Sequence, residues 1–583
     1  MRRADLGQLR GVDIAGDTPM NAVEREPGTV GRSGQVVGSV ADSSDAAARS
    51  SRRSALWLAV AYVSWRLGAD LSAVFVLPAG VALVLAVESA AVSDRRRWAA
   101  ACRLAVHWAG WLLVFGWMAY PVPVMATGWL LAAAASAAVF WAALGVGDFL
   151  RRRSGRRALL AVPLLVVLAE CVRRRVLAIA VDGLEQPLAD WVPMTRAAAF
   201  AGELGVLLLV MLLAASGVLI AFAAVTRVRS DALCGVAVFL ATAVVMVFAC
   251  FALPRAERSG RQFVVGVART TATSSVIGGP GQEAMFRQVV DALRRDLDRF
   301  DLVVLPETCL PPMLLIDGKA VRDASTREQG DLLRRAGRPA RQLAGRLHEL
   351  ACGPVVGGGI VTQITGVSGR SVLFRTPLPQ NCVLSVGSGG TVQVLSRKER
   401  LAPGIEEDPL RHILGRDVVS NTAFSRGHPS DSTSLQLETV PGQFAVAICY
   451  EAYFPGLIRR RVRGGESGLF VLADNADPTQ THAARSLRRA AQFRAVENGV
   501  PVAMSVNAGE SGVWNRFGMP TVSLGGTDHV VRRYEFPVDC GPTVYRRIGE
   551  WPLLIGCGLG LLQFVVPARS NPAALGGDAV HSE

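Results

Sequence analysis

The stretch Phe444-Ala445-Val446-Ala447-Ile448-Cys449-Tyr450-Glu451 places a short apolar run directly before a cysteine and two residues of different character. A run of this length is typical of a strand buried inside an α/β domain. A lone cysteine after such a run usually belongs to the core. Here the aromatic Tyr450 and the acidic Glu451 follow at once, which predicts an exposed turn from strand to helix. A nucleophile requires such a position, so Cys449 is a candidate nucleophile.

A second predicted strand ends in a carboxylate. Residues 302–305 are apolar, and Pro306 and Glu307 follow them directly. The rim of the sheet, where strands end, is where α/β domains place their sites. Glu307 is therefore a candidate acid–base group, and the alternative is a turn acid or a helix N-cap.

A third predicted strand, residues 392–397, ends at Lys398. The chain holds 62 basic residues, of which only Lys319 and Lys398 are lysines. A compact ammonium can hydrogen-bond an oxyanion from a confined position and can shift its pKa, unlike a guanidinium. Lys398 is therefore a candidate site residue. The alternative is chance survival of a surface lysine, which we assume for Lys319.

All three positions lie in residues 262–545, where short β-rich runs alternate with helical segments. An α/β domain of this size is ample for a core of its own. The predicted strands are residues 263–267, 302–305, 355–360, 381–386, 444–448, 469–472 and 500–506, and the predicted helices are residues 282–300, 325–351 and 482–498.

The preceding residues 55–254 form a ladder of apolar runs separated by arginine clusters. We expect seven membrane-spanning helices, near residues 55–68, 70–91, 102–121, 123–147, 158–180, 199–224 and 231–253, and an eighth at residues 551–567. Most arginine clusters, at residues 52–53, 95–97, 151–157 and 227–229, fall on one side, which the positive-inside rule makes cytoplasmic. The exception is residues 173–175. This topology places residues 262–545 outside the cytoplasm.

The composition agrees with a polytopic membrane protein that carries one globular domain. Half of the residues are hydrophobic, 19% are charged and the mean hydropathy is +0.32, whereas soluble chains carry about 25% charged residues. Residues 1–54 and 568–583 are polar and are expected to be disordered cytoplasmic tails. The net charge of +14 does not indicate nucleic-acid binding, because the arginines follow the membrane topology.

Cysteine and histidine spacing indicates neither a metal site nor a disulfide framework. The ten cysteines contain no CxxC pair, and the seven histidines are well separated. We therefore expect no metal and no cofactor, and we assign the nine cysteines other than Cys449 to the core.

Glu307, Lys398 and Cys449, in that order and between apolar runs, resemble the catalytic set of the apolipoprotein N-acyltransferase family, a membrane branch of the nitrilase (carbon–nitrogen hydrolase) superfamily. The family's lysine segment reads Lys-Arg-x-Leu-Val-Pro-Phe-Gly-Glu-x-x-Pro-Leu, and residues 398–410 read Lys-Glu-Arg-Leu-Ala-Pro-Gly-Ile-Glu-Glu-Asp-Pro-Leu. By this register Glu406 corresponds to an accessory glutamate. Cys449, Tyr450 and Glu451 match the family's Cys-Tyr-Glu. Other matching positions are Asn381, Arg494, Glu497, residues 507–511, and Glu170 with Arg173 or Arg174.

The resemblance implies a four-layer αββα sandwich carried by about eight membrane helices. It implies a general base at Glu307, oxyanion stabilisation by Lys398 and a nucleophile at Cys449, with Glu406, Tyr450 and Glu451 as accessory residues. The implied reaction moves a fatty acyl group from a phospholipid to the N-terminal amine of a diacylglyceryl-cysteine lipoprotein. The implied location is the bacterial inner membrane, with the domain extracytoplasmic, and we expect a monomer.

Three segments depart from the family pattern. The domain opens with Val-Ala-Arg-Thr at residues 267–270 where the family has Gln-x-Asn. Residues 474–478 lack the aromatics of the family's Asn-Asp-x-Trp-Phe-Gly loop, and His482 lies too early for its Gln-His pair. The alternatives are a nitrilase-like membrane protein of the conjugal-transfer type, a membrane-tethered amidase with the same three residues, or a non-catalytic assembly factor.

Overall fold

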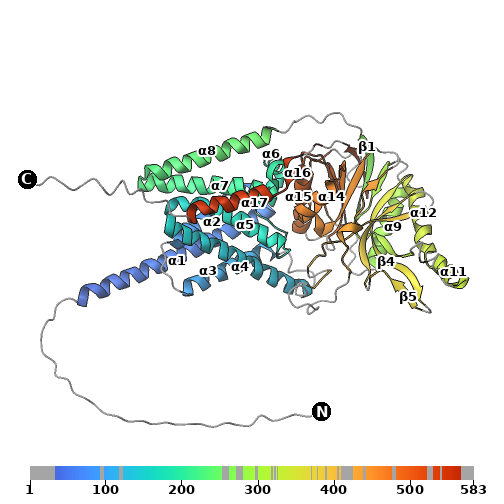
Figure 1. Ribbon diagram of the computed structural model, residues 1–583, viewed down its shortest axis with the longest axis horizontal. Helices are drawn as coiled ribbons and strands as arrows, with labels where there is room; N and C mark the ends of the chain where they lie inside the picture. The colour runs from blue at the N-terminus through green and yellow to red at the C-terminus, as the bar shows by residue number, and fades with distance from the viewer. Residues whose placement is uncertain are drawn as a thin grey trace, which may run out of the picture.

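The computed structural model divides into a helical bundle and an α/β domain that pack end to end (Figure 1). The residues it describes are 33–91, 97–116, 123–252, 262–270, 280–295, 300–316, 320, 324, 326–368, 371–376, 378–387, 390–403, 406–408, 424–437, 442–475, 481–507, 509–521, 530–538, 541 and 543–565. Lys319 and the expected tails at residues 1–32 and 568–583 lie outside them.

Each predicted apolar run forms a helix of the bundle. The long helices are α1 (Ser33–Asp70), α2 (Val76–Ala91), α3 (Arg97–Val114), α4 (Pro123–Ser154), α5 (Ala161–Arg175), α7 (Ala198–Thr226), α8 (Arg229–Ala252) and α17 (Trp551–Val565). The connections contain η1 (Ala73–Phe75), η3 (Arg156–Leu160), η4 (Gln186–Asp190) and α6 (Val192–Thr195). Among the residues that the structure describes, four segments are long and apolar enough to cross a membrane: Ala73–Ala90, Gly128–Ser154, Ala198–Thr226 and Arg229–Phe251. Apolar helices at Ala99–Val114 and Trp551–Val565 are shorter, so eight spans remain a prediction.

The expectation of a disordered tail up to residue 54 is wrong for its last part, because α1 already begins at Ser33. Residues 45–55 contain four alanines, the best helix former. Two serines of this segment also contact α2: Ser54 donates a hydrogen bond to the carbonyl of Ala86 at 2.9 Å, and Ser50 donates one to the carbonyl of Ser89. A polar composition is therefore compatible with a helix once a neighbouring helix accepts these hydrogen bonds.

The α/β domain contains one sheet that folds over on itself. Its strand order is β7-β6-β4-β2-β1-β11-β10-β9-β8. In addition, β12 pairs with β11, β13 pairs with β1, and β3 and β5 pair with β4. The strands are β1 (Gln262–Thr270), β2 (Leu302–Val304), β3 (Leu310–Ile316), β4 (Val355–Ser368), β5 (Ser371–Phe374), β6 (Gln380–Val386), β7 (Val392–Arg397), β8 (Leu435–Gln436), β9 (Gln443–Ile448), β10 (Gly468–Asp474), β11 (Val502–Asn507), β12 (Gly512–Trp514) and β13 (Val531–Pro537). The two halves join where Arg269 and Thr270 of β1 pair with Val506 and Asn507 of β11.

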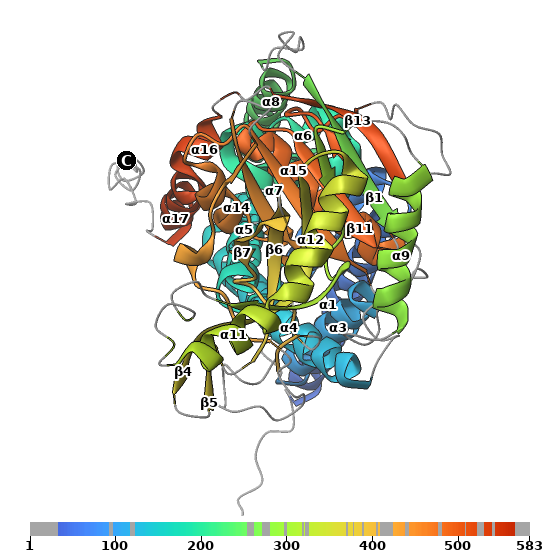
Figure 2. The same cartoon turned by 90° about the vertical axis from the view of Figure 1, so that its right-hand side faces the viewer.

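Helices cover both outer faces of this folded sheet. They are α9 (Pro280–Arg295), α11 (Arg327–Ala336), α12 (Arg338–Ala351), α14 (Pro455–Val462), α15 (Thr481–Asn498) and α16 (Val544–Ile548). Apolar side chains of both halves, including Phe263, Val304, Phe444 and Phe470, fill the space between them. Helices α9 and α12 lie across one outer face (Figure 2). On the other face α14 and α15 separate the sheet from the bundle. The layer order is therefore helix, sheet, sheet, helix.

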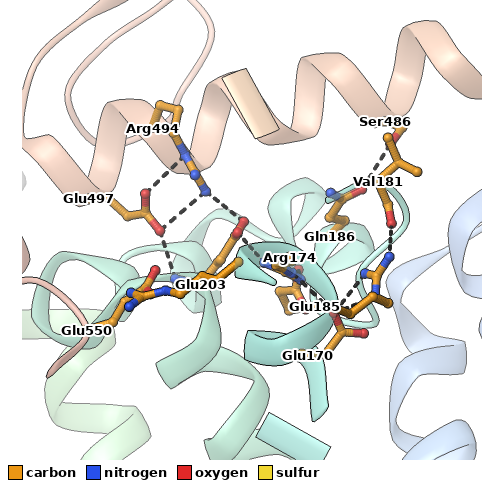
Figure 3. Close-up of polar contacts among 12 residues, drawn as sticks. Glu170, Arg174, Val181, Glu185, Gln186, Glu203, Ser486, Arg494, Glu497 and Glu550 are labelled. Atoms are coloured by element: carbon orange, nitrogen blue, oxygen red, sulfur yellow. Dashed lines mark hydrogen bonds and ion pairs between the residues drawn. The ribbon is translucent and has the colours of Figure 1, made fainter. Parts of the chain in front are cut away.

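A buried network of ion pairs joins α15 to the bundle (Figure 3). Arg174 of α5 contacts Glu170, Glu185 and Glu203, and its distance to Glu170 is 3.1 Å. Glu203 of α7 also contacts Arg494 of α15 at 2.7 Å. All these side chains are at most 5% exposed. Removing one member would leave an uncompensated buried charge, which is strongly destabilising.

Gly202 produces a kink in α7 that completes this network. Its φ of 72° lies in the left-handed region, which only glycine adopts without strain. A Cβ at this position would also lie 2.6 Å from the ring of Tyr545. The kink frees the backbone N–H of Glu203, which donates a hydrogen bond to Oε1 of Glu497 at 2.8 Å. The helix break therefore lets the α/β domain bind a backbone group of the bundle.

His482, at the start of α15, forms a second link between the two parts. Its Nδ1 lies 2.7 Å from Asp70 at the end of α1, and its Nε2 lies 2.9 Å from Asp182 in the loop after α5. Both ring nitrogens can donate only when the imidazole is protonated. Burial alone would lower the pKa of His482, but Asp182 and Asp70 together raise it above its ordinary value.

We predict that this link loses strength as the pH rises. A folded-state pKa above the ordinary 6.5 means that the stabilisation is fully present below pH 6.5 and is lost as the pH passes through the raised value. The apparent unfolding temperature of wild-type protein in detergent should therefore exceed that of His482→Gln most at pH 6, and the gap should narrow at higher pH. The control is His428→Gln, at an exposed position of the α/β domain. A gap that is independent of pH would contradict the prediction.

We also predict that the arginine-rich loops and the α/β domain lie on opposite sides of the membrane. Truncations that end after Arg157 and after Asp301 should carry a reporter into different compartments. Green fluorescent protein should fluoresce only after Arg157, and alkaline phosphatase should be active only after Asp301. The same compartment for both junctions would refute the topology.

Candidate active site

Glu307 lies at the end of β2 and is 4% exposed. Its Oε1 accepts a hydrogen bond from Nδ2 of Asn381 at 2.7 Å, and its Oε2 accepts one from the backbone N–H of Asp474 at 3.0 Å. A Cβ at Gly358 would lie 2.4 Å from Cα of Glu307, so only glycine allows β4 to approach this turn. Burial raises the pKa of Glu307, although Lys398 opposes the shift. A carboxylate with a raised pKa is suited to accept and return a proton.

Lys398 follows β7 and is 2% exposed. Its Nζ lies 2.7 Å from Oε1 of Glu307 and 2.8 Å from Oε2 of Glu406. Burial would lower its pKa, but the two carboxylates raise it well above its ordinary value. The ammonium is therefore a fixed positive charge that is almost completely withdrawn from water.

Glu406 lies where the resemblance implies an accessory glutamate. Besides the lysine, it accepts hydrogen bonds from the backbone N–H of Ala402 at 2.8 Å and from Nδ2 of Asn381 at 3.0 Å. Asn381 thus holds both carboxylates that contact Lys398. These hydrogen bonds hold the carboxylate of Glu406 between the backbone of Ala402 and the ammonium of Lys398.

Cys449 begins the short helix η7 (Cys449–Tyr453), directly after β9. Its φ of 48° is a strained conformation for a residue other than glycine. Burial and the charges of Glu307 and Glu406 raise the pKa of the Cys449 thiol, whereas Lys398 lowers it. The pKa of this thiol therefore depends on the charges of Glu307, Glu406 and Lys398 together.

Glu451 fixes the position of this elbow. Its carboxylate accepts hydrogen bonds from the backbone N–H of Ile448 at 2.8 Å and from that of Glu399 at 2.7 Å. Arg461 of α14 binds the same carboxylate at 2.7 and 2.9 Å. Because Glu399 follows Lys398, these contacts hold residues 398–403, the lysine loop, against the turn from β9 to η7 at Cys449, the cysteine elbow. Glu451 is a positioning residue.

Tyr450 points away from the charged centre and toward the bundle. Its hydroxyl donates a hydrogen bond to the carbonyl of Ala178 at 2.6 Å, in the loop after α5. Burial raises its pKa to about 12. The side chain therefore acts as a tether between the elbow and the loop after α5.

Asp474 and Asn507 lie behind Glu307, and the family comparison of residues 474–478 and 507–511 predicted no role for either side chain. Asp474 accepts hydrogen bonds from the hydroxyl of Thr308 at 2.7 Å and from Nδ2 of Asn507 at 2.8 Å, and Asn507 accepts one from the hydroxyl of Thr270 at 2.9 Å. Asp474 and Asn507 each end an apolar strand. The rule that identified Glu307 would therefore have identified them too.

The other cysteines differ from the expectation in part. Cys309 and Cys382 are buried, and burial raises the pKa of each thiol to about 12. Cys102 and Cys352 are exposed, so assigning all nine to the core is wrong. Cys102 lies within α3 and Cys352 directly follows α12, so neither comes after a buried strand. Within the described residues, no three His, Cys, Asp or Glu side chains are grouped to hold a metal ion.

Parts of the chain are similar to known proteins. Residues 280–519 match the carbon–nitrogen hydrolase family. The apolipoprotein N-acyltransferase of Shewanella oneidensis is 30% identical over 171 residues, which are 28% of this chain and 32% of that protein. The enzyme of that name from Brucella suis biovar 1 is 27% identical over 300 residues, half of this chain and 51% of that protein.

The matched segments therefore span about one third to one half of these curated relatives. Among solved structures, an amidase from Nesterenkonia sp. aligns with 52% of this chain and 98% of its own, at 17% identity and a TM-score of 0.32. The comparisons confirm the resemblance found in the motifs: residues 280–519 are similar to carbon–nitrogen hydrolases, and part of the chain is similar to apolipoprotein N-acyltransferases.

We predict that the charges around Cys449 control its reactivity. Lys398→Met removes the cation that lowers the thiol pKa, so alkylation of Cys449 by iodoacetamide should require a higher pH. Glu307→Gln should shift the profile the other way, since Glu307 raises the thiol pKa. Mass spectrometry of the Cys449 peptide across a pH series measures both, with the exposed Cys352 as internal reference. Unchanged profiles in both variants would contradict the electrostatic argument.

Proposed function

We propose that this protein is a membrane-embedded N-acyltransferase of the apolipoprotein N-acyltransferase type. It moves a fatty acyl group from a phospholipid, through a thioester on Cys449, to the N-terminal amine of a diacylglyceryl-cysteine lipoprotein. The observation that carries this proposal is the buried Lys398, held by Glu307 and Glu406 beside the strained Cys449 elbow. The curated relatives support the transferase chemistry by their names.

In the first half-reaction, Glu307 takes the thiol proton while the Cys449 sulfur attacks the ester carbonyl of the phospholipid. A thiol is a weak nucleophile until it is deprotonated, so an adjacent base is required. Negative charge develops on the carbonyl oxygen, and the ammonium of Lys398 stabilises it. One such donor contributes about 2.7–4 kcal/mol to the transition state.

Collapse of this intermediate breaks the ester bond. Glu307 returns its proton to the departing oxygen, and a lysophospholipid leaves. The acyl group then remains on sulfur as a thioester. Accessory groups keep their positions: Glu406 orients Lys398, Glu451 fixes the elbow and Tyr450 ties it to the bundle.

In the second half-reaction Cys449 becomes the leaving group, whereas Glu307 and Lys398 act as they do in the first. The α-amine of the lipoprotein attacks the thioester, Lys398 again stabilises the oxyanion, and Glu307 takes a proton from the amine. Collapse releases the amide product, and the thiolate recovers the proton from Glu307. The bundle presents the domain at the outer leaflet of the bacterial inner membrane, where both lipid substrates lie, and one chain contains the full set of groups.

The test is direct detection of the acyl-enzyme. Incubation with phospholipid should add a fatty acyl mass to the Cys449 peptide, and hydroxylamine should remove it. Cys449→Ser should trap little, and Lys398→Ala should acylate roughly 10²–10³-fold more slowly, because an oxyanion donor is lost. Arg346→Gln, on the exposed face of α12, is the matched control and should acylate normally.

The fate of the thioester separates the proposal from its alternatives. An acyltransferase holds it until an amine acceptor arrives, which gives ping-pong kinetics with a diacylglyceryl-cysteine peptide. Rapid loss to water, with turnover of small amides, would indicate an amidase. Normal function of Cys449→Ala in cells would refute both enzymes and favour an assembly factor.

A further inference from the structure

A cavity of about 590 Å³ lies beside the lysine loop, where the α/β domain meets the bundle. Its walls come from three places: the residues that follow Lys398, the start of α14, and the helix ends of α5 and α17. Cys449 does not line it, but Glu399 and Arg400 do. The cavity is therefore a neighbour of the candidate active site and not part of it.

The walls of this cavity are strongly basic. Six arginines line it (Arg174, Arg175, Arg400, Arg426, Arg459 and Arg460) against two glutamates (Glu399 and Glu550), which leaves a formal surplus of four positive charges. Arg174, Arg175, Arg426 and Arg460 each contact a glutamate. The net attraction for an anion thus depends most on Arg400 and Arg459.

Arg459 and Arg400 carry charges that no carboxylate of the described residues pairs with. Arg459 donates to the backbone carbonyls of Tyr545 at 3.0 Å, Arg546 at 2.9 Å and Arg547 at 2.6 Å, so its guanidinium is held in place by neutral acceptors. Arg400 is exposed, and its guanidinium stacks on the ring of Phe454 at 5.2 Å. The first residues of α14, Pro455 to Leu457, also line the cavity. A helix N-terminus favours an anion, which adds to the two cations.

The other wall is apolar and continues into the bundle. Trp551, which is 62% exposed, opens the apolar helix α17, and Arg175 stacks on its ring at 5.2 Å. Ile555, Leu559 and Leu562 continue outward from it along α17, each more than half exposed. Tryptophan and arginine at the end of an apolar helix are typical of the level of lipid headgroups. An anion in this cavity could therefore carry acyl chains that lie along α17.

We propose that this cavity binds the phosphate of a phospholipid headgroup and prefers headgroups of net negative charge. This proposal rests on the proposed function in one respect: the bound phospholipid would be the acyl donor of that reaction. Arg400 is two residues from Lys398, a span of at most about 7 Å along the chain, and the ester carbonyls of a phospholipid lie a few bonds from its phosphate. A donor held here by its headgroup reaches the cysteine elbow with its ester.

The test measures lipid binding to full-length Cys449→Ala protein, so that chemistry plays no part. Native mass spectrometry compares phosphatidylglycerol with phosphatidylethanolamine of the same acyl chains. We expect phosphatidylglycerol to bind more tightly, and Arg400→Gln to weaken it about fivefold, the effect of one surface charge on an anionic lipid. Arg346→Gln, on the far face of the domain, removes the same charge and should change nothing.

Further arms fix the meaning of each outcome. Arg459→Gln should act in the same direction, and Arg459→Lys, which keeps the charge, should bind like the parent; Arg400, which makes no structural hydrogen bond among the described residues, carries the test if Arg459 variants unfold. Equal binding of the two lipids, or no effect of Arg400→Gln, would overturn the proposal. So would displacement of phosphatidylglycerol by inorganic phosphate at equal concentration, which would mark a free-anion site. Thioester formation on Cys449 remains a separate readout of the proposed function.

Discussion

The ion pairs of one buried ammonium hold the α/β domain's site together. Lys398 is withdrawn from water at a cost that only paired and hydrogen-bonded carboxylates can offset. Glu307 comes from the end of β2 and Glu406 from the loop after β7, and Asn381 of β6 hydrogen-bonds to both. The order β7-β6-β4-β2 brings these segments to one edge. Loss of either carboxylate would leave the buried ammonium of Lys398 with only one of its two ion pairs.

A second set of buried charges places this site against the bundle. Arg174 and Arg494 share Glu203, which stands beside the break that Gly202 makes in α7. The hydrophobic contacts around them are not directional, whereas these ion pairs require one relative position of α5, α7 and α15. The hydrogen bond from Tyr450 to the carbonyl of Ala178 joins the cysteine elbow to the loop after α5, so the elbow is positioned relative to the same helices. Specific docking of the domain therefore depends on polar groups inside an apolar interface.

Local patterns in the sequence predicted much of this architecture. The predicted apolar helices form, and so do strands such as residues 444–448 and 469–472. Their hydrophobic pattern depends only on which residues are buried and not on which segment buries them. The grouping of Glu307, Lys398 and Glu406 followed from the family motif, and strand ends alone indicated only its first two members. Contacts between distant segments could not be read in this way. The ion pair of Arg494 with Glu203, the link of His482 to Asp70 and the start of α1 at Ser33 all depend on a partner hundreds of residues away or on a neighbouring helix.

Lysine is nearly absent from the chain, so its presence at position 398 indicates a task that arginine does not perform there. With two lysines among 62 basic residues, arginine performs almost every other cationic task here, from the network of Figure 3 to the basic cavity. A guanidinium is larger and spreads its donors in one plane, as Arg174 does toward Glu170, Glu185 and Glu203. An ammonium has three donors in a tetrahedral arrangement, and in this site two of them meet carboxylates on different segments. The third remains for the oxyanion of the proposed reaction, which a compact ammonium can approach from this confined position.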